Sequence, residues 1–188
     1  MAENRSSEEA FRALVDPSTG VLRPGALAAP DRSSAYAVFT QRPDAALDIE
    51  ALKNQALRFF KTKIGLTIDK RYGAFIPDTD AARVVVASDD GTASGTRLVF
   101  GRPVHPSDLV AAEEAERTQN SNGMALLAQR CPMLWLVVQE TNDDRVALTI
   151  AAIFASVFLG PVLSPKGDEL FGVRTARMKL EGRSAPYR

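Results

Sequence analysis

The chain has 188 residues, of which 45% are hydrophobic and 24% are charged, as in an ordinary globular protein. Its 23 basic and 23 acidic residues cancel, which argues against partners bound by charge alone, such as nucleic acid or an anionic membrane. The single cysteine excludes a disulfide framework, and the single histidine excludes a paired-histidine metal site. We therefore expect neither a metal nor another cofactor.

Residues 1–35 are predicted to form an N-terminal helix followed by a linker. Residues Ser6 to Glu9 match a capping box, which would begin the helix. The same segment carries acidic residues where a signal peptide would carry basic ones. Residues 17–35 contain three prolines and two glycines, which is typical of a loop. The remainder, residues 36–188, is predicted to be one domain, and we expect the protein to be cytoplasmic.

A strand is predicted at Ala35 to Thr40, followed by an amphipathic helix. This helix would begin at Asp44 or Asp48 and end with Gly65 just beyond its last turn. Its hydrophobic residues recur at three-and-four spacing: Ile49, Leu52, Ala56, Phe59 and Phe60. Four runs rich in Val, Ile, Phe and Tyr then predict an antiparallel meander, at residues 66–68, 72–76, 83–88 and 96–100, with a hairpin loop at 89–95.

The second half of the chain alternates predicted helices and strands. Ser107 is expected to begin a polar helix that ends near Thr118, where residues 120–123 interrupt it. The apolar run 133–139 predicts a strand that is covered on both faces. Hydrophobic and polar residues alternate within the segment from Leu170 to Leu180, which predicts a long strand with one exposed face.

The longest uncharged segment, Val146 to Pro165, has the length of a membrane-spanning helix. However, Gly160 and Pro161 end a helix, because proline lacks an amide donor and disfavours helical geometry in the residue before it. The helical part, Arg145 to Leu159, is then only about 22 Å long. We therefore expect a helix buried in a protein core and no membrane partner.

Ala147, Ala151 and Ala155 recur every four residues on this helix, opposite a stripe of larger apolar side chains. Such a row of small residues lets another backbone approach closely. The neighbour is either another part of the same chain, which makes the row part of a monomer core, or the same helix of a second subunit, which makes it an oligomer seam. The sequence leaves both alternatives open.

Together these elements predict an α+β fold. We expect a single domain with a mixed, mainly antiparallel sheet and helices packed on it, one of them fully apolar and central.

One local arrangement suggests a ligand. Arg102, His105 and Ser107 surround the predicted start of a helix, whose free amide groups can bind a small anion. Asp108, in the first turn of the same helix, competes for that position. The turn that contains Asn120 and Asn122 is predicted to border the same pocket.

Other candidates for chemistry have simpler explanations. Cys131 is predicted to lie at the carboxyl end of a helix, which raises a thiol pKa and makes a poor nucleophile. Four acidic residues form two pairs in the sequence, Asp78 with Asp80 and Asp89 with Asp90, and a predicted strand separates the pairs. They are therefore better explained as turn residues than as metal ligands. Basic residues gather at 58–71 and at 174–188, and they would follow a phosphate backbone only if both groups lined one face.

No motif in the sequence names a reaction. The leading hypothesis is therefore a non-catalytic binding or assembly module. Its partner would be a second copy of the chain, joined through the apolar helix 145–159, or another protein. The alternative is a small enzyme or a small-anion-binding protein, with its site near the 102–108 loop and the 120–123 turn.

Overall fold

The computed structural model describes residues 17–18, 30–43, 47–68, 80–91 and 93–182. The predicted helix that begins at Ser6, the predicted strand at 72–76 and Asp78 lie outside the described residues. The division of the chain at residue 35 stays a prediction.

Seven strands form one sheet in the order β2-β3-β4-β5-β1-β6-β7, and every pairing between them is antiparallel. The strands are β1 (Ala35–Thr40), β2 (Thr62–Ile68), β3 (Asp80–Ser88), β4 (Ser94–Pro103), β5 (Met133–Val138), β6 (Val162–Leu163) and β7 (Leu170–Phe171). A short 3-10 turn, η1 (Arg32–Ser34), precedes β1. The predicted α+β class is confirmed.

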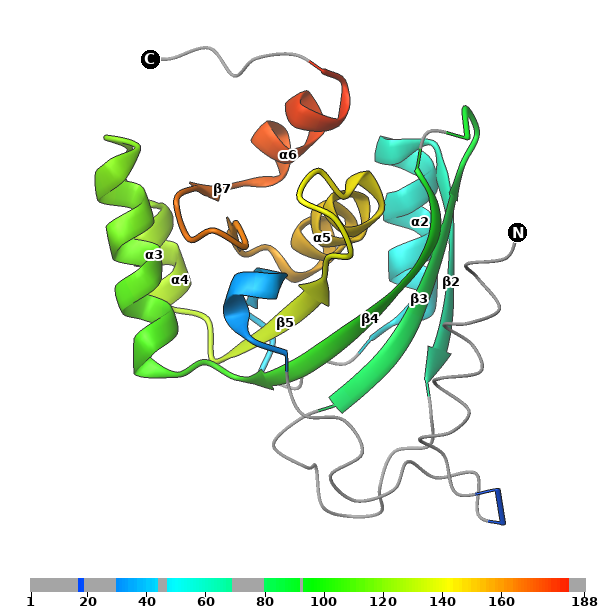
Figure 1. Cartoon of the computed structure of the whole chain (residues 1–188), viewed down its shortest axis with the longest axis horizontal. Coiled ribbons are helices and arrows are strands. Elements are labelled where there is room, and N and C mark those ends of the chain that lie inside the picture. The colour runs from blue at the N-terminus through cyan, green and yellow to red at the C-terminus, as the bar shows by residue number, and fades with distance from the viewer. Residues whose placement is uncertain (1–16, 19–29, 44–46, 69–79, 92, 183–188) are drawn as a thin grey trace.

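Five α-helices are described, and they cover both faces of the sheet (Figure 1). They are α2 (Ile49–Phe60), α3 (Pro106–Thr118), α4 (Met124–Gln129), α5 (Arg145–Phe158) and α6 (Val173–Leu180). The sheet curves around α2 and α5, and α6 packs on the far side of α5. Helices α3 and α4 cover the opposite face of the central strands. Strand β5 is therefore buried on both sides, as its uninterrupted apolar sequence predicted.

Helix α2 matches the predicted amphipathic helix except at its end. Asp48 begins it, because its carboxylate accepts hydrogen bonds from the backbone N–H groups of Glu50 (3.0 Å) and Ala51 (3.1 Å). The prediction that Gly65 ends the helix was wrong. Lys61 adopts the left-handed conformation instead (φ 50°), so the chain turns directly into β2, and Gly65 pairs with Val85 inside the sheet.

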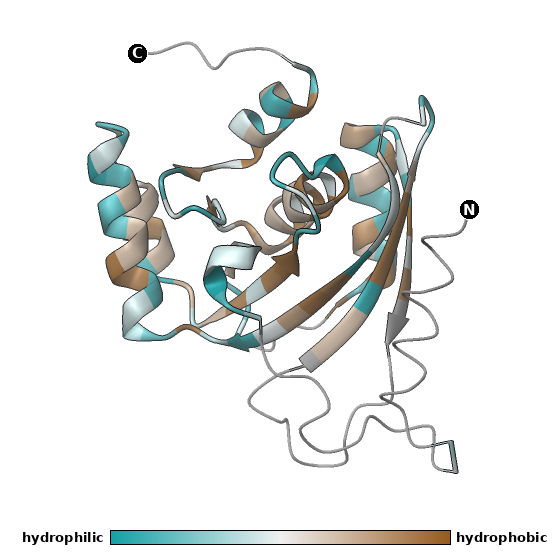
Figure 2. Ribbon diagram, viewed as in Figure 1, coloured by the Kyte–Doolittle hydropathy of each residue, from teal (hydrophilic) through white to brown (hydrophobic). Residues whose placement is uncertain are grey.

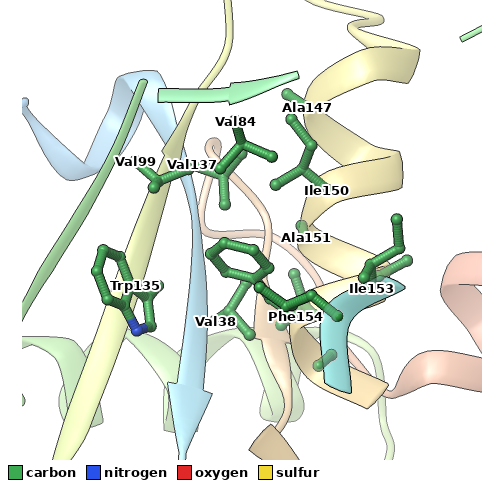
Figure 3. Close-up of a cluster of buried hydrophobic side chains, with 14 of the residues drawn as sticks. Val38, Val84, Val99, Trp135, Val137, Ala147, Ile150, Ala151, Ile153 and Phe154 are labelled. Carbon is green, nitrogen blue, oxygen red and sulfur yellow. The ribbon is translucent and has the colours of Figure 1, made fainter. Parts of the chain in front are cut away.

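Helix α5 is the predicted apolar central helix, and ten of its 14 residues are buried. Figure 2 shows its hydrophobic ribbon against the more hydrophilic α3. Its large side chains point at the sheet, where Phe154 meets the Trp135 ring edge-on at 5.9 Å between centroids (Figure 3). Phe158 extends the same contact, 5.6 Å from Phe154. None of the helices in the described part of the chain combines the length and the hydrophobicity that crossing a bilayer requires.

Helix α5 ends before Gly160, as predicted, and close packing against β1 explains why residue 160 is a glycine. Leu159 takes the left-handed conformation (φ 57°), and Gly160 then lies directly against β1. A Cβ atom on Gly160 would be 1.9 Å from the carbonyl oxygen of Phe39. The close approach lets the Phe39 N–H donate a hydrogen bond to the Pro161 carbonyl at 3.0 Å.

The predicted long strand at Leu170 to Leu180 was wrong. Only β7 is extended, and α6 follows it immediately. Val173, Ala176 and Leu180 recur at spacings of three and four, so a helix places all three against α5. The alternation that suggested a strand consists of Ala176, Met178 and Leu180, so it shares two residues with the helical spacing, and the packing against α5 decides between the two periods.

Candidate functional site

The predicted anion position at the start of α3 is filled by the chain itself. Arg102 and Asp108 form a two-point ion pair, with Nη1 to Oδ2 at 2.7 Å and Nη2 to Oδ1 at 2.8 Å. The His105 backbone N–H donates to the same carboxylate at 2.8 Å, and His105 stands at the N-cap of α3, two residues before the predicted cap Ser107. Burial alone would raise the pKa of Asp108, but the hydrogen bonds from Arg102 and His105 outweigh it and hold the pKa below its usual value.

The structure separates the other two predicted site residues from this cluster. Asn120 and Asn122 follow the opposite end of α3, and a helix of 13 residues is about 20 Å long. Asn120 is exposed and takes the left-handed conformation (φ 52°), and Gly123 then begins α4 with φ 101°. The segment therefore interrupts the two helices as predicted, but it does not share a pocket with Arg102.

The alanine row on α5 belongs to the core of a single chain. Ala147, Ala151 and Ala155 are each fully buried without any second subunit, in the cluster formed between α5, the sheet and the neighbouring helices. A second copy of α5 cannot reach them unless this core opens.

Another ridge of α5 is the floor of an elongated trough. Along this ridge Arg145, Thr149 and Ser156 are followed by Leu159, the residue just after α5, at steps of four, seven and three residues. Two cavities of about 430 and 450 Å³ lie above it, the first over Arg145 and Thr149, the second over Ser156 and Leu159. We call this space the trough, its Arg145 side the hairpin end and its Leu159 side the far end.

Helices α2 and α6 form the two walls of the trough. Both pack on α5, and they lie on either side of it (Figure 1). The two cavities share Phe59 of α2, Arg177 of α6 and Glu181 in their linings, so they are neighbours along the ridge. Phe59 is 38% exposed and Leu159 is 65% exposed, and Met178 of α6 also lines the space. The trough therefore presents large apolar side chains to solvent along its wall and at its far end.

The hairpin end of the trough carries charged side chains of both signs, three acidic and three basic: Asp89, Asp90, Glu181, Lys61, Arg145 and Arg177. Asp89 and Asp90 line it from the loop between β3 and β4. The carboxyl ends of α2 and α6, at Lys61 and Leu180, also line it, and the last carbonyls of a helix carry partial negative charge. Arg145 offsets part of this charge, because its guanidinium donates a hydrogen bond to the Leu180 carbonyl.

The far end of the trough is basic. Arg174 and Arg177 line it from α6, and Arg177 has Glu181 3.6 Å away as a partial counter-charge. On the opposite wall, the Arg58 guanidinium lies 5.1 Å from the centre of the Phe59 ring. Arg58 from one of the two basic groups of the sequence thus lies beside Phe59, and Arg174 and Arg177 from the other group line the same cavity as Phe59.

A third cavity, of about 540 Å³, is lined by Tyr36 and by several charged residues, two of which form an ion pair with one another. The Lys179 ammonium lies 2.7 Å from the Glu169 carboxylate, and the Ser164 hydroxyl donates to Asp168 at 2.7 Å. Burial and then the surrounding carboxylates, Asp144 first, raise the pKa of Tyr36 to about 12. This phenol stays protonated near neutral pH and does not act as a base there.

Cys131 lies in a hydrophobic cluster, where burial disfavours the thiolate that nucleophilic chemistry needs. Cys131 is buried behind α4, and its thiol donates to the Leu127 carbonyl at 3.3 Å. Burial raises the pKa of this thiol to about 11. The raised pKa therefore comes from the loss of hydration more than from the partial charge of the nearby helix end.

The trough was not predicted from the sequence, because the segment that forms one of its walls was predicted to be a strand. With 170–180 predicted as a strand, Arg174 and Arg177 had no helix on which to face Phe59. The one available signal was the spacing of Val173, Ala176 and Leu180, which fits a helix that buries one side. Comparison with protein-family models, with curated proteins and with solved structures gives no match to this chain.

Proposed function

We propose that this protein is a non-catalytic binding module that holds an apolar segment of another protein in the trough. The observation that carries the proposal is the alignment of two cavities over one ridge of α5, with Phe59 and Leu159 exposed in them. Exposed aromatic and aliphatic side chains in a concave surface are typical of peptide-binding grooves. The framework supports this role, because α5 is held by the sheet core beneath it.

The polar side chains that could have served catalysis already make contacts within the fold, which favours a binding role over a catalytic one. Asp108 is held by Arg102, and Asp144 is held by Arg97, so these carboxylates serve the fold. The Cys131 thiol is protonated near neutral pH for the reason given above. The alternative of a small-anion site near residue 102 lacks support from Asn120 and Asn122, which lie at the other end of α3.

A partner of different sequence is favoured over a second copy of the chain. Occupying the trough requires a stripe of large apolar side chains, and α5 keeps its own stripe buried. The exposed large apolar residues elsewhere on the described helices are isolated: Leu57, Val110 and Leu126. None of the described helices exposes such residues at spacings of three and four, as a symmetric docking helix would need.

The proposal is tested by selecting peptides from a random display library against the intact protein and measuring how binding depends on the trough. Phe59→Glu and Leu159→Glu each place a charge on an apolar surface that the peptide must cover. Leu57→Glu is the matched control, because Leu57 is 63% exposed and lies about 200° around α2 from Phe59. Circular dichroism confirms that each variant is folded.

Selected peptides are expected to lose at least about tenfold in affinity for both trough variants and to bind the Leu57→Glu variant normally. Peptides that bind all four proteins equally would place the binding surface elsewhere and refute the proposal. Failure to enrich any peptide would refute it as well.

A further inference from the structure

The far end of the trough, unlike the hairpin end, carries a net charge. Arg174 and Arg177 line it, and among the described residues of its lining Glu181 alone is acidic. The Arg58 guanidinium adds a further positive charge beside the Phe59 ring. At the hairpin end, by contrast, the three acidic and the three basic side chains cancel. Charge can therefore select a ligand at the far end of the trough.

The fold leaves this positive charge largely uncompensated. Arg177 and Glu181 are 3.6 Å apart, and their side chains are 43% and 46% exposed, so water screens the attraction between them. Arg174 is exposed, and the structure gives it no ion pair with any of the residues that it describes. The guanidinium groups of Arg174 and Arg177 are therefore available to a ligand.

Arg174 also has an unfavourable position on its own helix. It is the second residue of α6, whose first turn contains no acidic residue and whose N-cap, Gly172, provides no side-chain hydrogen bond. The start of a helix carries partial positive charge, so a basic side chain there is disfavoured. Because Arg174 is exposed, packing does not explain this choice of residue. Residues that break a local rule without serving the fold are expected at functional sites.

Leu159, which lines the same cavity, is a second exception of this kind. It adopts the left-handed conformation (φ 57°) after the last turn of α5, where glycine or asparagine is ordinarily favoured. Its side chain is 65% exposed, so burial in the core does not offset the backbone strain. One basic and one apolar exception thus line a single cavity of about 450 Å³, together with Phe59.

We propose, resting on the proposed function, that the partner segment carries an acidic side chain beside a large apolar one, and that this pair binds at the far end of the trough. The apolar side chain covers Phe59 and Leu159, and the carboxylate accepts hydrogen bonds from Arg174 and Arg177. A cavity of about 450 Å³ lies within the usual range of ligand sites, about 300 to 1,000 Å³. Recognition needs only these two side chains, so a helical and an extended segment can both satisfy it.

The test uses the linear peptides that a random display library yields against the intact protein. Each enriched peptide is synthesised with Glu, Gln or Lys at the position of its acidic residue. Fluorescence anisotropy at low and at high salt gives the affinity of each form for the native protein and for three double variants. These are Arg174→Gln/Arg177→Gln, Arg174→Glu/Arg177→Glu and the control Arg117→Gln/Arg130→Gln, whose two arginines are exposed at the ends of α3 and α4. Circular dichroism verifies that each variant is folded.

The enriched peptides are expected to contain Asp or Glu close to a large apolar residue. The Glu form should bind the native protein and the control variant about tenfold more tightly than the Gln form at low salt, with a smaller ratio at high salt. The two forms should bind Arg174→Gln/Arg177→Gln with nearly equal affinity. The Arg174→Glu/Arg177→Glu variant should prefer the Lys form, an exchange of preference that damage to the fold would not produce.

The outcomes separate the two proposals. Enriched peptides that lack an acidic residue but depend on Phe59 and Leu159 would overturn the acidic partner and leave the proposed function intact. An unchanged ratio between the Glu and Gln forms in Arg174→Gln/Arg177→Gln would do the same. If the enriched peptides bind the Phe59→Glu and Leu159→Glu variants normally, both proposals fail. Both also fail if no peptide is enriched and laurate, a fatty acid, binds in an Arg174-dependent manner by calorimetry, since the ligand is then a lipid carboxylate.

Discussion

Asp144 and Arg97 form a two-point ion pair that fastens the start of α5 to strand β4, with Oδ2 2.6 Å from Nε and Oδ1 3.0 Å from Nη2. The same carboxylate accepts hydrogen bonds from the backbone N–H groups of Ala147 and Glu140, each at 2.9 Å. One side chain therefore caps the central helix, shapes the loop before it and neutralises an arginine that is only 12% exposed.

Asp144→Ala is expected to lower the free energy of unfolding by about 3 to 5 kcal/mol, because it removes a helix cap and leaves the Arg97 charge without its main partner. Urea unfolding followed by circular dichroism measures the loss. Asp143→Ala is the control, since Asp143 is exposed and next in sequence, and it should change stability by less than about 0.5 kcal/mol. Equal effects of the two substitutions would show that the pair contributes nothing specific.

Acid should destabilise the protein through two carboxylates. Burial would raise the pKa of Asp144 and Asp108, but hydrogen bonds from Arg97 and Arg102 respectively lower both below the usual value. A pKa that is lower in the folded state gives stabilisation that is complete above the unfolded value, about 3.9, and lost as pH falls through the folded value.

Below about pH 4, the unfolding free energy of the native protein is therefore expected to fall as pH falls. The Asp108→Asn/Asp144→Asn variant should start from lower stability and show a shallower decrease. Urea titrations at a series of pH values compare the two slopes, and parallel slopes would assign the acid sensitivity to other groups.

Ala151→Asp should unfold or aggregate the chain, since Ala151 is fully buried within one protomer and an unpaired buried carboxylate costs several kcal/mol. Ser156→Asp is the matched control on the same helix, because Ser156 is half-buried at the trough. Circular dichroism and light scattering distinguish the outcomes. A folded Ala151→Asp protein with reduced mass would instead mean that the alanine row is a subunit interface.

Gly160→Ala is expected to cost more than about 3 kcal/mol, because the new Cβ atom would lie 1.9 Å from the Phe39 carbonyl oxygen and the backbone must move. Gly65→Ala meets only Val85 Cβ, at 3.9 Å, and should be nearly neutral. Thermal unfolding of the two variants gives the comparison. A melting temperature for Gly160→Ala equal to that of the native protein would contradict the close packing of this turn on β1.

Cys131 should react slowly with a disulfide reagent in the native protein and rapidly in urea. With a pKa of about 11, roughly one thiol in a thousand is ionised at pH 8, and burial restricts access further. Absorbance of the released thiol follows the reaction. Cys131→Ala should lower stability by about 1 to 2 kcal/mol through the small cavity that it leaves. Fast modification of the folded protein would show that the segment around Cys131 opens readily.

Local sequence patterns correctly predicted the secondary structure of those elements that their own residues determine. The Asp48 cap and the spacing of the apolar residues predicted α2, and the uncharged run ending at Gly160 predicted a buried α5. The buried central strand β5 was predicted for the same reason, since a strand covered on both faces carries no polar side.

Contacts between distant segments were not predictable from one sequence. Arg97 and Asp144 are 47 residues apart, and nothing local indicates that they pair. Arg102 and Asp108 are close in sequence, yet the anion hypothesis placed a ligand where the structure places Asp108. The trough depends on three helices whose order in space follows from the sheet, so a wrong assignment at 173–180 removed one wall entirely.

The position of β1 constrains the order in which the chain folds. β1 is the first strand along the described chain, but its neighbours in the sheet are β5 and β6, which end at residues 138 and 163. The β2–β3–β4 meander pairs strands that are consecutive in the sequence and can form early, whereas β1 pairs with residues of β5 that lie 93 to 103 positions further along the chain. During synthesis the segment Ala35 to Thr40 therefore emerges long before its partners, which leaves its apolar side chains open to premature association until β5 and β6 have been made.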